Sequence, residues 1–202
     1  MKSPCISITV ICIALSISEC VLAQQPGLVA PTFARTPIQV TNRSAQLVSP
    51  YSPSQKLRVV FGLKPSNPKE EQEFLEALYT EGSPQYHHFL TAKEWNDRFA
   101  PPAADEQAVV DWATSQGLTV TKRYPNRLLV DVEAPVSQIQ SALSVNINRY
   151  QLNGAAVFSN DRDPVIPASL SRIVMSVMGL NSIQVMHRHS NGGRQLIHPD
   201  YS

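Results

Sequence analysis

Residues 57–63 read LRVVFGL, and this stretch decides the fold. Every second residue from Leu57 to Leu63 is strongly apolar, which is typical of a strand with one buried face. The turn residues Pro65–Pro68 (PSNP) end this strand, and Pro68 suits the first position of a helix with acidic residues in its first turn. Apolar residues then recur at helical spacing. The sequence therefore predicts a strand followed by a helix, whose buried face comprises Phe74, Leu75, Leu78 and Tyr79.

Two further helices are predicted downstream of this unit. Thr91 and Glu94 form a capping box, in which a threonine cap is followed by glutamate at the third helical position. That helix runs through Trp95 and Phe99 and ends before Pro101. The next helix covers residues 104–116, because Gly117 is a typical terminating glycine. We expect Trp95 and Trp112 to be core residues of these two helices.

The second half of the chain alternates between strand and helix patterns. Residues 118–121 and 128–132 alternate and are separated by Tyr124-Pro125-Asn126, which predicts an antiparallel pair. Pro135 opens a helix, and residues 145–152 form another strand. Asn153-Gly154 is a strong hairpin signal that leads into residues 155–158. Residues 166–171 are expected to form one short helix.

The order of these elements indicates the fold class. Strand, helices, two strands, helix and strand is the order of the split βαβ unit. The sequence therefore predicts an α+β domain with a ferredoxin-like fold, in which an antiparallel sheet carries helices on one face. We place this domain at residues 56–180, with no internal repeat and no second domain.

The two ends of the chain differ from this domain in composition. Residues 1–23 combine an early lysine, an apolar run and small residues before a cleavage point between Ala23 and Gln24, which predicts a secretory signal peptide. Residues 24–55 are rich in proline, serine and threonine and are expected to form an extended leader. Residues 181–202 turn polar again and are expected to be a linker or tail.

This organisation predicts a secreted protein, extracellular or periplasmic, with no membrane segment after signal cleavage. All three cysteines lie within residues 1–23, so the exported domain would be held together without disulfides. The net charge of +1 gives no support for a nucleic-acid partner. Nothing in the sequence calls for a cofactor.

The adjacent histidines His87 and His88 lie in the stretch SPQYHHFLTAKEW, just ahead of the capping box. Neighbouring side chains do not share a helix face and point apart in extended structure, which disfavours a metal site. The commonest alternative is a loop whose aromatic residues, Tyr86 and Phe89, pack onto the core while a histidine stays in water. A third interpretation is a pH switch, because acid would charge both histidines beside the positive end of a helix. His87 and His88 are therefore the candidate pH-sensing residues.

Four segments in this order resemble the activation domain of pro-kumamolisin, the propeptide of the sedolisin-type serine-carboxyl peptidases. The segments are FGLKPSNPKEEQEFLEAL, SPQYHHFLTAKEWNDRFAP, VVDWATSQGLTV and IPASLSRIVMSVMGL. The resemblance covers residues 54–180. It implies a ferredoxin-like domain that helps a peptidase fold, covers its active site and is removed autocatalytically in acid.

The resemblance also implies what this chain does not supply. The family's peptidase domain carries a Gly-Thr-Ser motif, a glutamate and an aspartate four residues apart, and a calcium site, and the sequence has neither of the two catalytic motifs. The chain is therefore expected to be non-catalytic by itself, and calcium is expected only in a peptidase domain. The expected partner is a sedolisin-type peptidase domain in cis, and the alternative is a free-standing secreted inhibitor or binding module that acts in trans. The solvent face of the sheet is the expected contact surface.

Overall fold

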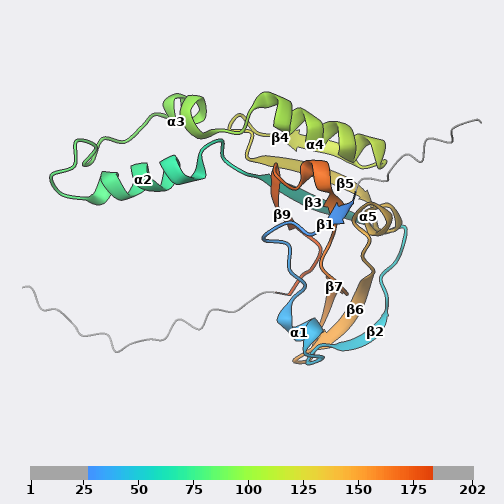
Figure 1. Ribbon diagram of the computed structural model, residues 1–202. Coiled ribbons are helices and arrows are strands. Elements are labelled where there is room, and N and C mark those ends of the chain that lie inside the picture. Colours follow the sequence, from blue (N-terminus) through green and yellow to red (C-terminus); the bar gives the residue numbers. More distant parts are fainter. Residues whose placement is uncertain (1–26, 184–202) are drawn as a thin grey trace, which may run out of the picture.

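The computed structural model describes residues 27–183 (Figure 1). The expected signal peptide, its cleavage point at Ala23 and Gln24, and the tail beyond residue 183 lie outside the described residues. The elements in chain order are β1 (Leu28–Val29), α1 (Ile38–Thr41), β2 (Gln46–Pro50), β3 (Lys56–Leu63), α2 (Pro68–Tyr79), α3 (Ala92–Phe99), α4 (Ala103–Ser115), β4 (Thr119–Arg123), β5 (Leu129–Pro135), α5 (Val136–Leu143), β6 (Ile147–Leu152), β7 (Ala155–Asn160), β8 (Ile166–Pro167), a 3₁₀ turn (Ala168–Leu170) and β9 (Val174–Met178).

The main sheet has four strands in the order β4-β5-β3-β9, and every neighbouring pair is antiparallel. This is the strand order of a ferredoxin-like fold, so the predicted fold class is confirmed. The sequence predicts residues 145–152 as the fourth strand of this sheet. That prediction is wrong, because β9 pairs with β3 in their place. A register shift between Gly62 and Leu63 interrupts this pairing. β9 has only five residues, and the shift breaks its alternation of inward and outward side chains. This alternation is the pattern by which a strand is recognised from sequence.

A second sheet of three strands has the order β2-β6-β7. The predicted hairpin at Asn153-Gly154 is confirmed, with φ of 49° and 81° at these residues, as a tight two-residue turn requires. A third pairing joins β1 to β8. Residues 166–170 form β8 and a single 3₁₀ turn, where the sequence predicts a short helix.

The segment assigned to an extended leader contributes to the fold from Leu28 onward, which corrects its placement outside the domain. β1 pairs with β8, β2 pairs with β6, and the Phe33 N–H donates to the Met175 carbonyl over 2.8 Å. Thr36 donates to the Asp163 carboxylate from its backbone N–H, over 2.7 Å, and from its hydroxyl. Strands of two and five residues are too short to show periodicity, so only their pairing partners reveal them.

Helices α4 and α5 cover one face of the main sheet. Val109 and Ala113 of α4 and Ile139 of α5 are fully buried in the core. The Phe61 ring of β3 meets the Trp112 ring edge-on, with centroids 5.5 Å apart. Helices on one face are thus confirmed for α4 and α5.

Helices α2 and α3, with the loop between them, form a helical arm that extends away from the sheets (Figure 1). The arm has its own small core, made by Phe74, Leu78 and Phe99 with Leu90 and Trp95 packed against it. The predicted capping box of Thr91 and Glu94 is present. Leu75 and Tyr79 were expected on the buried face of α2 but are 40% and 69% exposed, because the arm offers a narrower apolar surface than a sheet does.

The last described residues run along the edge of β7. The Ser182 N–H donates to the Phe158 carbonyl over 2.9 Å, and the Asn160 N–H donates to the Leu180 carbonyl over 3.1 Å. Leu180 and Ile183 are buried. Within residues 27–183, no helix has both the length and the apolar character needed to cross a bilayer.

Candidate functional site

The face of the main sheet opposite α4 and α5 is the candidate site, and we call it the open face. It is formed by the residues that alternate with the core residues: Lys56, Arg58, Val60 and Gly62 of β3, Leu129, Asp131 and Glu133 of β5, and Ser176 and Met178 of β9. Met178 is 44% exposed, and the Lys56 and Arg58 side chains are 69% and 61% exposed. The open face is therefore accessible to a partner at these three side chains, whereas Asp131 and Ser176 on the same face are buried.

Ion pairs run across the strands of the open face. Lys56 pairs with Glu133 over 3.0 Å, and Arg58 forms an ion pair with Asp131. The hydrogen bond to Asp131 and its negative charge raise the pKa of Arg58. The Tyr124 hydroxyl also donates to the same Asp131 oxygen over 3.2 Å, whereas the second oxygen, Oδ1, is buried without a partner among the described residues. These paired charges lie toward the start of β3 and the end of β5, whereas Gly62 and Leu129 pair at the opposite end of the two strands.

A groove of about 500 Å³ opens on this face at the end nearest the arm. Its lining is mainly apolar and combines residues of β3, β5, β9 and the start of α2 with residues of the loops that follow β3 and precede β5: Gly62, Leu63, Pro65, Glu71, Asn126, Leu128, Leu129, Met175, Ser176 and Met178. Sequence periodicity places Gly62 and Leu129 on this face. It could not place β9 there, because β9 is absent from the predicted strands.

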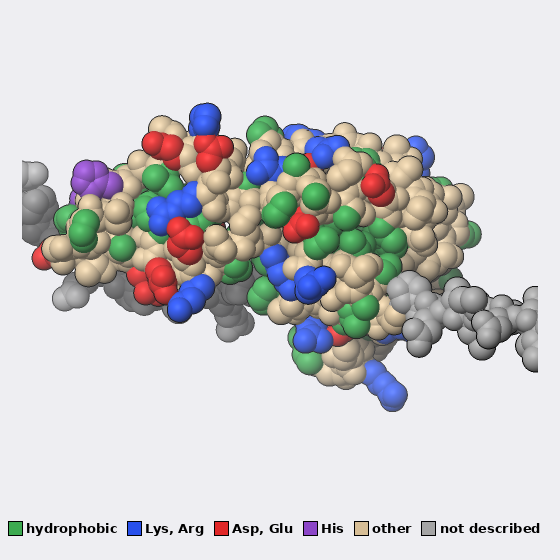
Figure 2. Space-filling model, turned by 45° about the horizontal axis from the view of Figure 1, so that its top comes forward, with side chains coloured by type: hydrophobic (Ala, Val, Ile, Leu, Met, Phe, Trp, Pro, Cys, Tyr) green, Lys and Arg blue, Asp and Glu red, His purple; other side chains and the backbone are tan. Residues whose placement is uncertain are grey.

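The candidate pH-sensing residues lie in the loop of the arm, away from the open face. His87 and His88 are both exposed, and the histidine side chains lie at the far end of the arm (Figure 2). His87 adopts φ 58°, donates its backbone N–H to the Leu78 carbonyl over 3.0 Å, and stacks its ring on Tyr86 at 3.9 Å between centroids. Phe89, expected to pack onto the core, is 65% exposed. Their role as a pH switch stays a prediction.

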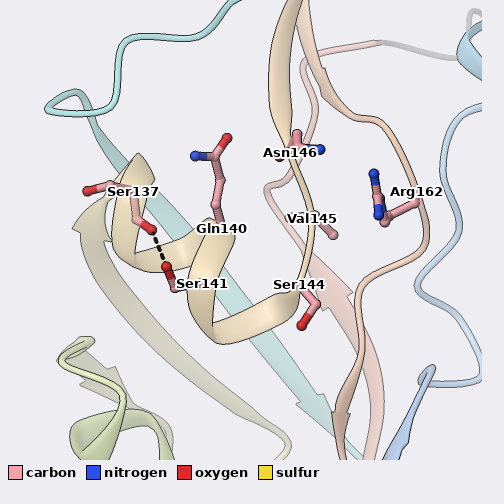
Figure 3. Close-up of a pocket in the computed structure, with 7 residues that line it drawn as sticks. All are labelled: Ser137, Gln140, Ser141, Ser144, Val145, Asn146 and Arg162. Atoms are coloured by element: carbon pink, nitrogen blue, oxygen red, sulfur yellow. Dashed lines mark hydrogen bonds between the residues drawn. The ribbon is translucent and has the colours of Figure 1, made fainter.

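A polar pocket of about 540 Å³ lies beside the end of α5 (Figure 3). Its polar groups are engaged within the fold: the Ser141 hydroxyl donates to the Ser137 carbonyl, and the Gln140 side chain accepts from the Ile147 N–H over 2.7 Å. Arg162 and Asn146 both donate to Asp161. The pocket is therefore better explained as part of the packing of α5. Among residues 27–183, no group of three histidine, aspartate or glutamate side chains gathers as a metal site.

We expect Asp161→Asn to destabilise the domain at neutral pH and not in strong acid. Burial of the Asp161 carboxyl raises its pKa, but hydrogen bonds from Arg162 and Asn146 outweigh this and lower the pKa to about 2. A depressed carboxyl pKa stabilises the fold above the unfolded-state pKa, and the contribution is lost as pH falls through about 2. After allowance for solvent screening, the loss at neutral pH is about 1 kcal/mol. Urea unfolding at neutral pH and at about pH 2 measures this loss of stability.

The control is Asp97→Asn, which removes an exposed ion pair with Lys93. An equal loss of stability at both pH values in Asp161→Asn would contradict the prediction.

Comparison with known proteins relates this fold and face to one family. The model of the pro-kumamolisin activation domain matches residues 43–183. The chain is 31% identical over 161 residues to sedolisin of Pseudomonas sp. (strain 101), and 34% identical over 131 residues to xanthomonalisin of Xanthomonas sp. (strain T-22).

These two relatives are sedolisin-family peptidases. The matches cover 78% and 65% of this chain but only 27% of sedolisin and 16% of xanthomonalisin, so the chain spans about a quarter or less of their length. The matched region corresponds to the propeptide of sedolisin-type precursors and is non-catalytic. The chain belongs to the family of pro-kumamolisin activation domains.

Proposed function

We propose that this chain is the propeptide of a secreted, acid-activated sedolisin-type peptidase, for which it serves as folding chaperone and inhibitor until proteolysis removes it. The observation that carries the proposal is the open face. One side of an antiparallel sheet is covered by α4 and α5, while the other presents a groove, Met178 and paired charges to a partner. Apolar surface rimmed by polar groups is typical of a protein interaction site.

The expected partner is a sedolisin-type peptidase domain in cis. A chain that binds through a preformed sheet loses little conformational entropy on docking, so it can bind tightly through a surface of ordinary size. The expected location is extracellular or periplasmic, on the basis of the signal-peptide pattern in residues 1–23. The alternative is a free-standing secreted inhibitor that acts in trans through the same face.

The test of this proposal is inhibition in trans. Residues 24–202 are expressed, their folding is checked by circular dichroism, and they are titrated against mature sedolisin from about pH 3 to about pH 7. We expect tight inhibition near neutral pH that weakens in acid. A folded chain that inhibits at no pH would overturn the proposed function.

The His87 and His88 hypothesis predicts a shift in this pH profile. Replacing both residues by glutamine removes the charges that acid would add at the far end of the arm. We expect inhibition by the double variant to persist to lower pH than inhibition by the wild type, with little change near neutral pH. Gln85→Ala, an exposed change in the same loop, is the control. Identical pH profiles for wild type and double variant would refute the switch.

A further inference from the structure

The floor of the groove on the open face is formed by Gly62 of β3 and Ser176 of β9, which pair with each other. A Cβ atom at Gly62 would lie 2.2 Å from the Ser176 hydroxyl oxygen, so this hydroxyl occupies the space that a side chain at Gly62 would take. Leu129 and Met178 flank this floor on the neighbouring strands. Two methionines, Met175 and Met178, line the groove, and flexible thioether side chains adapt to the shape of an inserted group. The mainly apolar lining and the two adaptable methionines therefore suit an inserted apolar side chain.

Glu71 supplies the negative charge at this groove, and it differs from the other glutamates of α2 because their carboxylates are paired within the described residues. Glu70 pairs with Arg98 over 2.7 Å, Glu73 pairs with Lys69 over 3.6 Å, and Glu76 accepts from Gln72 over 3.0 Å. The Glu71 carboxylate has no hydrogen-bond or ion-pair partner among the described residues, although Glu71 alone of the four lines the groove. Partial burial raises the pKa of Glu71, as expected for a carboxylate that loses water without gaining a donor.

We propose that the groove receives an apolar side chain of the peptidase domain, and that a lysine or arginine next to this side chain pairs with Glu71. The inference rests on the proposed function and assigns the chemistry of the contact. Charge complementarity supports this contact. An unpaired carboxylate at the rim of an apolar groove favours a partner that presents an apolar side chain beside a positive charge. The same carboxylate disfavours partners that present an acidic group there.

The test compares variants of Glu71 with matched variants of Glu73 in residues 24–202. Glu73 lies on the same helix, but its carboxylate is exposed and already paired with Lys69. Against mature sedolisin near neutral pH, we expect Glu71→Gln to weaken inhibition about tenfold and Glu71→Lys about 100-fold. Glu73→Gln and Glu73→Lys should change inhibition by less than about twofold.

The apolar part of the contact is tested separately. Leu129→Thr makes the groove more polar while keeping a residue that suits a strand, and we expect it to weaken inhibition about tenfold. Leu47→Thr is its control, because Leu47 lies 65% exposed on β2 of the second sheet.

Folding and docking effects are separated by unfolding each variant in urea. Because burial disfavours the charged form of Glu71, we expect Glu71→Gln to be at least as stable as the wild type at neutral pH. Weaker inhibition by an equally stable variant then reports the contact itself. If the wild type inhibits and Glu71→Lys inhibits equally well, the inference is wrong and the proposed function stands. If the folded wild type does not inhibit, the proposed function fails and the inference falls with it.

Discussion

Met178→Glu is expected to weaken inhibition of a sedolisin-type peptidase by about 100-fold while the domain stays folded. Met178 ends β9, pairs with Val60 of β3 and projects from the open face at 44% exposure. A glutamate there is solvated in the free domain but would be desolvated without a partner when the face is covered. A 100-fold loss corresponds to about 2.7 kcal/mol, which is within the range for truncating or opposing a central contact.

The measurement is an inhibition titration against mature sedolisin at near-neutral pH, with urea unfolding of the same samples. Leu47→Glu is the matched control, because it places the same charge on an exposed apolar position of a strand in the other sheet. Equal inhibition by wild type, Met178→Glu and the control would show that the open face is not the contact surface. The free domain should lose less than about 1 kcal/mol in either variant.

Phe61→Ala is expected to lower the free energy of unfolding by about 3–5 kcal/mol, the largest stability effect of a single change in this domain. Phe61 is fully buried on β3, the strand that pairs with both β5 and β9, and its ring packs edge-on against Trp112. Removing the ring leaves a cavity between the sheet and α4. A domain of this size has a total stability of about 5–15 kcal/mol, so the variant loses a large part of it.

Denaturant unfolding followed by tryptophan fluorescence measures this loss, because Trp112 contacts the altered site. Phe89→Ala is the control, since Phe89 is 65% exposed in the arm and should cost less than about 0.5 kcal/mol. A loss below about 1 kcal/mol for Phe61→Ala would contradict the placement of Phe61 in the core.

Sequence patterns were sufficient where an element is long and one of its faces is buried. β3, β5 and α5 follow from apolar periodicity, and the capping box and the Asn153-Gly154 turn follow from local hydrogen bonding and backbone conformation. These features depend on residues close in the chain, so a single sequence carries them.

The rest depends on contacts between distant parts of the chain. β9 and β1 are defined by pairing with β3 and β8, and the position of α2 depends on the small core it shares with α3. The same limit applies to the candidate site. Alternation in β3 and β5 predicts which side chains share the open face, but the groove needs β9 and the start of α2 beside them. In the sequence, Glu71 cannot be distinguished from the other glutamates of α2. Only the structure shows that the carboxylates of these other glutamates are paired and that Glu71 lines the groove.

The place of β9 at the end of the domain has a consequence for the order of folding during synthesis. β3 is among the first strands to leave the ribosome, yet its hydrogen bonds to β9 join residues 60–63 to residues 174–178. Until β9 emerges, one side of β3 is an unpaired edge with apolar side chains, which is a template for aggregation. Pairing at this sequence separation is also slow, because a long loop must close first. That edge of β3 therefore stays unpaired until β9 has been synthesised.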